Sequence, residues 1–226
     1  MSKIYFQGTF GAYSHIAALK IEPNAEIIPC KTFDECFLKA SLESDSRIVI
    51  PESNRITGNI GIEYLIFKYR LNIYAEHFLK IEHNLLGQPG SSISDIKNVF
   101  SHAQALSQCS NFIKKNNLTE NVRADTAGSA ETIAKDKIKN EAAIASSLSA
   151  KIYKLKILEP NIENENSNTT RFLVMGKEVA QPDFGKKKYI TSFLFKLKSK
   201  PAALYQSLSG FAINGINLTK LQSYPE

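Results

Sequence analysis

The sequence predicts an α/β protein of two lobes with a cleft between them, followed by a segment of different character. Short apolar runs alternate with amphipathic helical patterns, which is typical of strands connected by helices. This series occurs twice, and a long extended stretch over residues 73–86 separates the two occurrences. After a linker at residues 179–188 the pattern changes, and residues 189–198 alternate like a half-buried strand.

Composition narrows the class of protein. The chain has 226 residues, 43% hydrophobic and 22% charged, which predicts a packed core in one larger domain plus a fragment, or in two small lobes. No apolar run reaches the roughly 20 residues of a membrane helix, and the N-terminus lacks a signal-peptide layout. The lysines behind the net charge of +6 are scattered, so we expect neither a nucleic-acid partner nor a membrane partner.

The three cysteines point to a reducing compartment. Cys30, Cys36 and Cys109 are odd in number and do not have the spacing of metal ligands. We therefore expect a cytoplasmic protein without a metal site.

In the first lobe, strands and helices alternate in the order typical of a parallel sheet. Ser14 is expected to cap the first helix, and Thr32 with Glu35 forms a capping box for the second. The predicted order is a strand at 4–6, a glycine-containing turn at 7–13, a helix at 15–21, a strand at 26–29, a helix ending near 42, a strand at 47–51, a polar loop at 52–59 and a helix at about 60–69.

The second lobe repeats this alternation, with Ser129 as a candidate helix cap. A strand at 156–158 is expected to return the chain to the first lobe, so lobe one takes about 1–75 and 156–178 and lobe two about 80–155. Crossing segments between two lobes imply a cleft, which is a common place for small ligands. The predicted order is a strand at 98–100, a helix led by 101–104 and ending near 114, a strand at 122–125, a helix led by 126–131, a strand at 142–145 and a helix from 146 to about 155.

The final segment is expected to hold two strands and one helix. The first strand covers residues 189–198, and Pro201 is expected in the first turn of a helix that continues to about residue 213. Asn214 and Gly215 break that helix, and residues 216–221 form the second strand.

The entrance of the strand at residues 168–172 is the first candidate site. This stretch closes a polar loop and opens the apolar run 172–175. Arg171 is one of only five arginines among 28 lysines and arginines, and its planar guanidinium suits carboxylate recognition. An edge strand with a solvated start is the alternative interpretation.

Two other places could bind a ligand. The strand, glycine turn and helix start over residues 4–15 can form an anion site, because free backbone N–H groups point outward there. The turn is not G-x-G-x-x-G, so a dinucleotide site is not favoured. The polar loop 52–59 follows a strand's carboxyl end, where α/β proteins place ligand contacts, although an ordinary connection remains the alternative.

Several blocks together resemble the prephenate dehydratase family, and they keep its order over essentially the whole chain. The resemblance implies a two-lobed, type II periplasmic-binding-protein-like catalytic domain at 1–178, a linker at 179–188 and a partial α+β, ferredoxin-like ACT domain at 189–226. The blocks are FQGTFGAYSH at 6–15, SHAQAL at 101–106, DTAGSA at 125–130, NTTRF at 168–172 and, for the ACT domain, NLTK at 217–220.

The resemblance implies a carbon–oxygen lyase in L-phenylalanine biosynthesis. Prephenate would lose its ring carboxylate as CO2 and its ring hydroxyl as water, leaving phenylpyruvate, and aromatisation would drive the reaction without a cofactor. L-phenylalanine as effector and a homodimer are the further partners that it implies. The alternative is a non-catalytic or decayed two-lobed binding protein for an aromatic keto acid.

The resemblance places the catalytic groups at Asn54, Gln104 and Thr170. Thr170 would act as an oriented hydrogen-bond donor to the leaving hydroxyl. Asn54 and Gln104 would hold the hydroxyl or the carboxylate through neutral amides, because a strong cation would stabilise the charged ground state and oppose CO2 loss. Arg171 would hold the pyruvyl carboxylate. The other substrate-binding candidates are Thr9, Ser101, His102, Thr126, Ser129, Asn168 and Phe172.

The chain also departs from the family pattern. Arg55 follows Asn54 where the family has a serine, which adds bulk and charge near the proposed cleft. The ACT segment contains only the first strand, helix and second strand of its fold, so we expect no working phenylalanine site. The regulatory candidates that the resemblance offers are Ala203, Leu204, Gln222 and Ser223; the motif of the last two continues into Tyr224 and Pro225.

Overall fold

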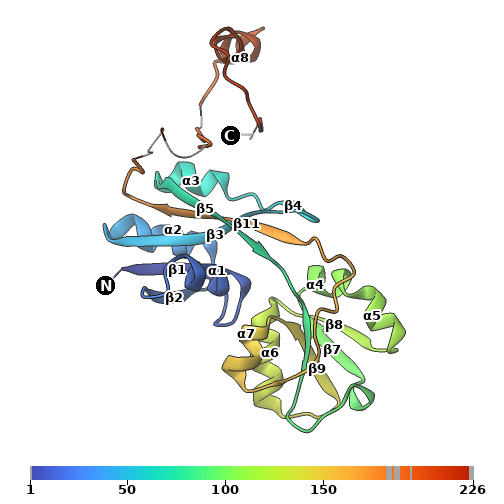
Figure 1. Ribbon diagram of the computed structural model, residues 1–226. Helices are drawn as coiled ribbons and strands as arrows, with labels where there is room; N and C mark the ends of the chain where they lie inside the picture. The colour runs from blue at the N-terminus through green and yellow to red at the C-terminus, as the bar shows by residue number, and fades with distance from the viewer. Residues whose placement is uncertain (1, 182–184, 186–188, 194, 224–226) are drawn as a thin grey trace. The chain divides into compact units, whose positions relative to one another are not determined.

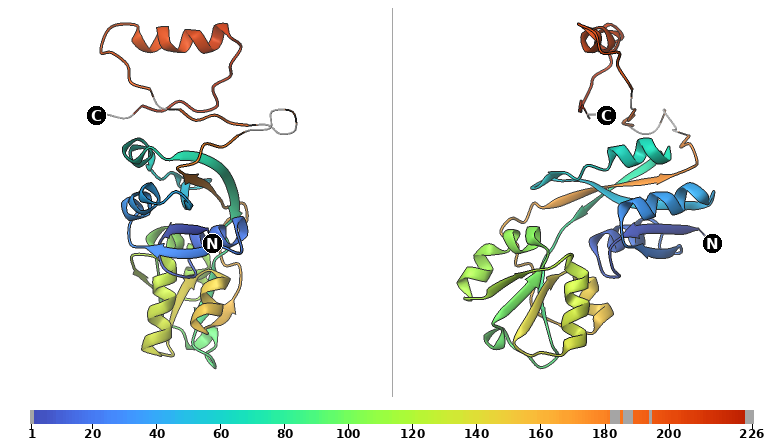
Figure 2. Two further views of the ribbon diagram at one scale, coloured as in Figure 1. Left: turned by 90° about the vertical axis from the view of Figure 1, so that its left-hand side faces the viewer. Right: turned by 180° about the vertical axis from the view of Figure 1, so that it is seen from behind.

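The computed structural model describes residues 2–181, 185, 189–193 and 195–223. The chain divides into two compact units, Met1–Gly185 and Lys186–Glu226, and each is described by itself. The first unit consists of two lobes, each built on its own sheet (Figures 1 and 2). The two-lobed α/β architecture predicted from the sequence is confirmed.

The first lobe is built on a mixed sheet. Its strands are β1 (Lys3–Gln7), β2 (Glu26–Cys30), β3 (Ser46–Asn54), β4 (Gly58–Asn59), β5 (Asn72–Lys80) and β11 (Thr169–Gly176). The order is β2-β1-β3-β11-β5, with β4 paired to β3. The strands β2, β1 and β3 are parallel, whereas β11 runs antiparallel to both β3 and β5. A strand from late in the chain therefore completes the sheet between two early strands.

Helices cover both faces of this sheet. They are α1 (Tyr13–Ile21), α2 (Phe33–Leu42) and α3 (Glu63–Tyr69). On one face Ala17 and Ala18 of α1 pack with Phe172 of β11, and on the other Phe37 of α2 packs with Leu65 of α3. Each face buries its own apolar cluster, as expected for a sheet between two helical layers.

The two predicted caps in this lobe have different outcomes. Thr32 caps α2, with its hydroxyl accepting from the N–H of Glu35 at 3.1 Å, while the Glu35 carboxylate accepts from the N–H of Lys31. Ser14 was predicted to cap α1, and this was wrong. The chain turns earlier, at Gly11 with φ +94°, so the helix begins at Tyr13 and Ser14 lies inside it.

The second lobe has a five-stranded sheet in the order β10-β6-β9-β7-β8. Its strands are β6 (Asn84–Gly87), β7 (Asn98–Ser101), β8 (Thr119–Val122), β9 (Glu141–Ala145) and β10 (Lys156–Glu159). Its helices are α4 (Ala103–Gln108), α5 (Ser110–Lys115), α6 (Thr126–Asp136) and α7 (Ser147–Tyr153), with a short 3-10 helix at Ile93–Asp95. Leu106 of α4 belongs to the core of one face and Ile133 of α6 to that of the other.

Several predicted boundaries in this lobe were wrong. The strand expected at 122–125 is β8, which lies earlier, at Thr119–Val122. Asp125 is not part of it and caps α6 by accepting from the N–H of Gly128. Its carboxylate is a better cap than the Ser129 hydroxyl, which lies inside the helix and donates to the Asp125 carbonyl. The expected helix 101–114 breaks at Cys109 into α4 and α5. The strand β10 pairs with β6, so it belongs to the second lobe.

Two segments cross between the lobes side by side. The first joins β5 to β6 and the second joins β10 to β11. The N–H of Ile81 donates to the carbonyl of Asn168 at 2.9 Å, and the N–H of Ile162 donates to the carbonyl of His83 at 2.8 Å. The predicted extended stretch at 73–86 is largely confirmed, as β5 and β6 with the crossing residues between them.

The lobes also meet at the turn between β1 and α1. The carbonyl of Gly11 accepts from the hydroxyl groups of Ser146 at 2.6 Å and Ser149 at 3.1 Å, both at the start of α7. The carbonyl of Phe10 accepts from the hydroxyl of Tyr153 at 2.8 Å. Side-chain hydroxyl groups of the second lobe therefore fix the backbone of this turn without any charged group.

The second unit contains α8 (Ala203–Ile213), which ends before Asn214 as predicted. The helix starts after Ala202, with φ +61°, rather than at Pro201. The strands expected at 189–198 and 216–221 do not form among the described residues; Leu194 lies outside them. Strands without partners are not stable, which explains this difference. The linker prediction at 179–188 falls partly outside the described residues, at 182–184 and 186–188, as do Tyr224 and Pro225.

None of the helices in the described ranges has both the length and the apolar character that crossing a membrane requires.

Candidate functional site

The candidate site lies where β3 and β11 pair at the entrance of the first lobe's sheet. Thr170 of β11 stands opposite Asn54 of β3 in the register. The side-chain amide of Asn54 donates to the hydroxyl oxygen of Thr170 and to the side-chain carbonyl of Asn168, each at 2.8 Å. Thr170 is 7% exposed and Asn168 is 1% exposed. The structure thus brings three of the predicted site residues together.

Asn54 is fully engaged within the protein. Its side-chain oxygen accepts from the N–H groups of Ile56 at 3.0 Å and Thr57 at 3.1 Å. Its two amide hydrogens go to Thr170 and Asn168. A primary amide has two donors and one oxygen with two lone pairs, so this capacity is filled. In this structure Asn54 therefore has no free donor for a substrate, contrary to our expectation, and its amide instead contacts the Thr170 hydroxyl.

The contact with Asn54 fixes how Thr170 can act. Its hydroxyl oxygen accepts from Asn54, and among the described residues no hydrogen bond is donated by this hydroxyl. A threonine hydroxyl has one donor, so that donor is available to a bound molecule. The site offers an oriented neutral donor at the end of a strand.

A chain of polar side chains extends from this cluster into the second lobe. The side-chain amide of Asn168 donates to Oε1 of Gln108 at 3.0 Å. Nε2 of His83 contacts the same oxygen at 2.9 Å, and Nδ1 of His83 contacts the hydroxyl of Tyr13 at 2.8 Å. Sequence reasoning missed Gln108, His83 and Tyr13. One signal was present, since the polar residues Glu82, His83 and Asn84 separate Ile81 from the apolar residues Leu85 and Leu86.

Burial keeps the two titratable side chains in this row, His83 and Tyr13, uncharged. Burial lowers the pKa of His83, although the hydrogen bond to Gln108 and the nearby Glu163 act in the opposite direction. Burial also raises the pKa of Tyr13, with smaller contributions from Cys109, Glu163 and Glu82. Both groups are therefore uncharged at neutral pH.

Arg171 does not join the cluster. Its Nε donates to the carboxylate of Glu76 at 2.7 Å, and its Nη1 donates to that of Glu52 at 3.2 Å. Adjacent residues of a strand point to opposite faces, which separates Arg171 from Thr170. Its charge is balanced by two carboxylates, so the expectation that it holds a substrate carboxylate is corrected.

Three other predicted site residues serve the fold. Phe172 is 1% exposed and belongs to the core between β11 and α1, so it does not line a cleft. Ser101 donates to the carbonyl of Ile144, and Ser129 donates to that of Asp125. Their hydroxyl groups are buried and occupied, which corrects their assignment to substrate binding.

The remaining candidates are accessible. His102 caps α4, with Nδ1 accepting from the N–H of Gln104 at 3.3 Å. Gln104 is exposed and precedes Gln108 by one helical turn, so both lie on one face of α4. Among the described residues, the side chains of Thr9 and Thr126 have no hydrogen-bond partner. These four stay candidates.

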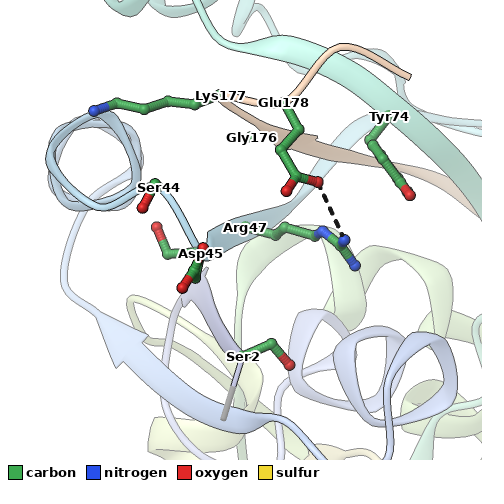
Figure 3. Close-up of a pocket in the computed structure, with 9 residues that line it drawn as sticks. Ser2, Ser44, Asp45, Arg47, Tyr74, Gly176, Lys177 and Glu178 are labelled. Atoms are coloured by element: carbon green, nitrogen blue, oxygen red, sulfur yellow. Dashed lines mark ion pairs between the residues drawn. The ribbon is translucent and has the colours of Figure 1, made fainter. Parts of the chain in front are cut away.

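A cavity of about 140 Å³ lies at the other end of β11 and has different chemistry (Figure 3). Arg47 projects into it and pairs with the carboxylates of Glu22 at 3.3 Å and Glu178 at 3.7 Å. Its guanidinium also lies over the ring of Tyr74, 4.5 Å from the centroid. Gly176, at the end of β11, lines the cavity, whereas Thr170 lies near the start of the same strand, so this cavity is separate from the candidate site.

Comparison with known proteins gives one consistent family. The family model described as prephenate dehydratase matches residues 4–180. "Arogenate dehydratase 2" of Petunia hybrida is 40% identical over 99% of this chain and 57% of its own length. "Arogenate dehydratase/prephenate dehydratase 2, chloroplastic" of Arabidopsis thaliana is 39% identical, over 99% and 58%. The chain thus spans little more than half the length of these two plant relatives.

A solved structure agrees with the sequence comparison. The prephenate dehydratase of Staphylococcus aureus subsp. aureus Mu50 is 28% identical, with a TM-score of 0.76 over 100% of this chain and 84% of its own.

Proposed function

The chain belongs to the prephenate dehydratase family, and from this we propose that it converts prephenate to phenylpyruvate by decarboxylation and dehydration. The observation that carries the proposal is the free hydroxyl donor of Thr170, held in place by Asn54. The site supplies this donor among neutral groups, as the departure of a hydroxyl and of CO2 requires.

The proposed step needs one proton and no redox partner. The bond between the ring and its carboxylate breaks, its electron pair enters the ring, and the hydroxyl on the opposite ring carbon leaves. Prephenate and one proton thus give phenylpyruvate, CO2 and water. The Thr170 hydroxyl donates a hydrogen bond to the departing oxygen, where negative charge develops in the transition state.

Gln104 is the proposed contact from the second lobe. It is an exposed neutral amide on α4, and a neutral partner does not stabilise the departing carboxylate in the ground state. Thr9 and Thr126 are proposed substrate ligands, because their hydroxyl groups are unoccupied and both follow strands of their lobes. His102 acts through the start of α4, and Asn168 acts through Asn54.

Two further assignments belong to this proposal. The three free cysteines, Cys30, Cys36 and Cys109, are buried, which fits a reducing compartment such as the cytoplasm. The segment 189–226 is proposed to be the partial ACT domain, following the catalytic domain 1–178 and a linker.

Incubation of the purified chain with prephenate tests the proposal. We expect phenylpyruvate at neutral pH well above the spontaneous rate, with Thr170→Val as the matched blank. Arogenate, which the relatives' names include, carries an amine in place of the keto group and undergoes the same ring chemistry, so it is assayed in parallel. Turnover of arogenate but not of prephenate would make arogenate the substrate in place of prephenate. Binding of either compound without turnover would favour the non-catalytic binding protein.

Replacement of Arg55 tests the departure from the family pattern. The side chain of Arg55 is exposed, and its N–H donates to the carbonyl of Thr169 at 2.9 Å, a contact that any residue retains. We expect Arg55→Ser to fold normally and to raise kcat or lower KM, because a bulky charge leaves the end of β3. A rise in KM measured by steady-state kinetics would instead make Arg55 a substrate ligand.

The final segment is expected to bind no phenylalanine. Ala203 and Leu204 lie in α8, which has no buried residue, and Gln222 and Ser223 belong to no helix or strand. A ligand site that is not enclosed by packed side chains gives little binding energy. Calorimetry with millimolar L-phenylalanine should therefore show no heat of specific binding. Binding that disappears on deletion of residues 188–226 would mean that this segment does form a site.

A further inference from the structure

From Asn54 to Nε2 of His83, the hydrogen bonds that join the candidate site to the second lobe run in a single direction. They start at backbone N–H groups, which can only donate, and these fix the oxygen of the Asn54 side chain toward the loop. The amide hydrogens of Asn54 then face the Thr170 hydroxyl and the Asn168 oxygen. The nitrogen of Asn168 must therefore point the other way, toward the second lobe.

Gln108 accepts the next hydrogen bond in this row of polar side chains. Its Oε1 accepts from the Asn168 amide at 3.0 Å, so that oxygen can only accept from His83 as well. His83 therefore carries its proton on Nε2, and its Nδ1 faces the Tyr13 hydroxyl at 2.8 Å, a hydroxyl that also donates to the carbonyl of Glu82 at 2.7 Å. Each member of the chain determines the orientation of the next.

Gln108 also connects three parts of the fold. It is the last residue of α4, in the second lobe, whereas its two donors come from the two crossing segments. Its backbone carbonyl accepts from the N–H of Asn164 at 2.6 Å, which fixes the end of the helix to the second crossing segment. Because Gln104 lies one turn earlier on the same face, the position of Gln108 determines where Gln104 stands relative to β11.

We propose that Gln108 and His83 are positioning residues for the reaction, with Gln108 as the shared acceptor that aligns the donors of both lobes. Gln108 holds Asn168, Asn168 holds Asn54, and Asn54 leaves the Thr170 hydroxyl free to donate. Neither Gln108 nor His83 needs to touch the substrate. The kinetic part of this inference rests on the proposed function.

Kinetics of three variants test the proposal. Gln108→Leu removes the acceptor, and we expect kcat to fall about tenfold, as for a lost hydrogen bond, with KM within about twofold. Gln108→Glu retains an accepting oxygen and should keep at least about half of the turnover. Ser107→Ala is the control on the same helix, since Ser107 is exposed and its side chain has no partner among the described residues. Where the leucine variant does not fold, Gln108→Ala takes its place with the same expectation.

A second readout does not depend on activity. The side-chain amide resonances of Asn54 should shift in Gln108→Leu and stay in place in Ser107→Ala, and the ¹⁵N shifts of His83 should show the proton on Nε2. If wild-type protein has no turnover, the proposed function fails, while these spectra still decide the coupling. Unchanged Asn54 resonances, unchanged kcat in Gln108→Leu, or equal losses in Gln108→Glu and Gln108→Leu would each overturn the proposal.

Discussion

Thr170→Val is expected to lower kcat about a hundredfold or more, the range for a lost oriented donor, with a smaller change in KM. Valine keeps the shape of the side chain and removes the hydroxyl that donates to the leaving oxygen. The variant also leaves an Asn54 donor without its acceptor, so we expect unfolding to become easier by about 1–3 kcal/mol. Steady-state kinetics and urea unfolding measure the two effects separately.

Two controls isolate the hydroxyl of Thr170. Thr170→Ser keeps the hydroxyl and should retain most of the turnover. Thr169→Val changes the preceding residue, whose hydroxyl only contacts the carbonyl of Ser167 at 3.5 Å, and should change kcat little. Near wild-type turnover in Thr170→Val would remove Thr170 from the mechanism.

Gly11→Ala is expected to destabilise the folded protein by about 2–4 kcal/mol, the sum of backbone strain and overpacking. Gly11 has φ +94°, and a Cβ there would lie 2.5 Å from Oγ of Ser149 and 2.9 Å from its Cα. The backbone atom cannot move without shifting α7, so the contact between the turn and the second lobe should open. Urea denaturation measures the loss of stability.

Gly90→Ala is the matched control for this variant. Gly90 has a similar backbone, with φ +88°, and a Cβ added there would meet no atom within 4 Å beyond its chain neighbours. Gly90→Ala should therefore lose only the stability that backbone strain costs, about 1 kcal/mol. Equal losses of stability in the two variants would show that the close approach to Ser149 contributes nothing.

Local patterns predicted much of the fold because the relevant interactions are local. Apolar runs bounded by turns located most strands, and the Thr32 cap marks α2 in both sequence and structure. The end of β3 was placed too early, since its polar residues looked like a loop. Those residues pair with β11 more than a hundred positions later, and no local pattern records such pairing.

The same limit applies to the candidate site. The resemblance to a family identified Thr170 and Asn54, but it could not show that Asn54 uses all its hydrogen bonds within the protein. Arg171 looked available for a carboxylate because its partners, Glu52 and Glu76, are distant in sequence. Non-local partners therefore decide which polar residues remain free to act.

A double-mutant cycle between Asn54 and Thr170 tests most directly whether Asn54 acts through Thr170. Asn54→Leu has a similar shape, and the N–H groups of Ile56 and Thr57 that it releases are exposed to water. We expect Asn54→Leu to lower kcat about tenfold in wild type and by less than about threefold when Thr170→Val is already present, because residues that act as a unit are not additive. Losses that multiply in the double variant would contradict the account, since Asn54 would then act on the substrate independently of Thr170.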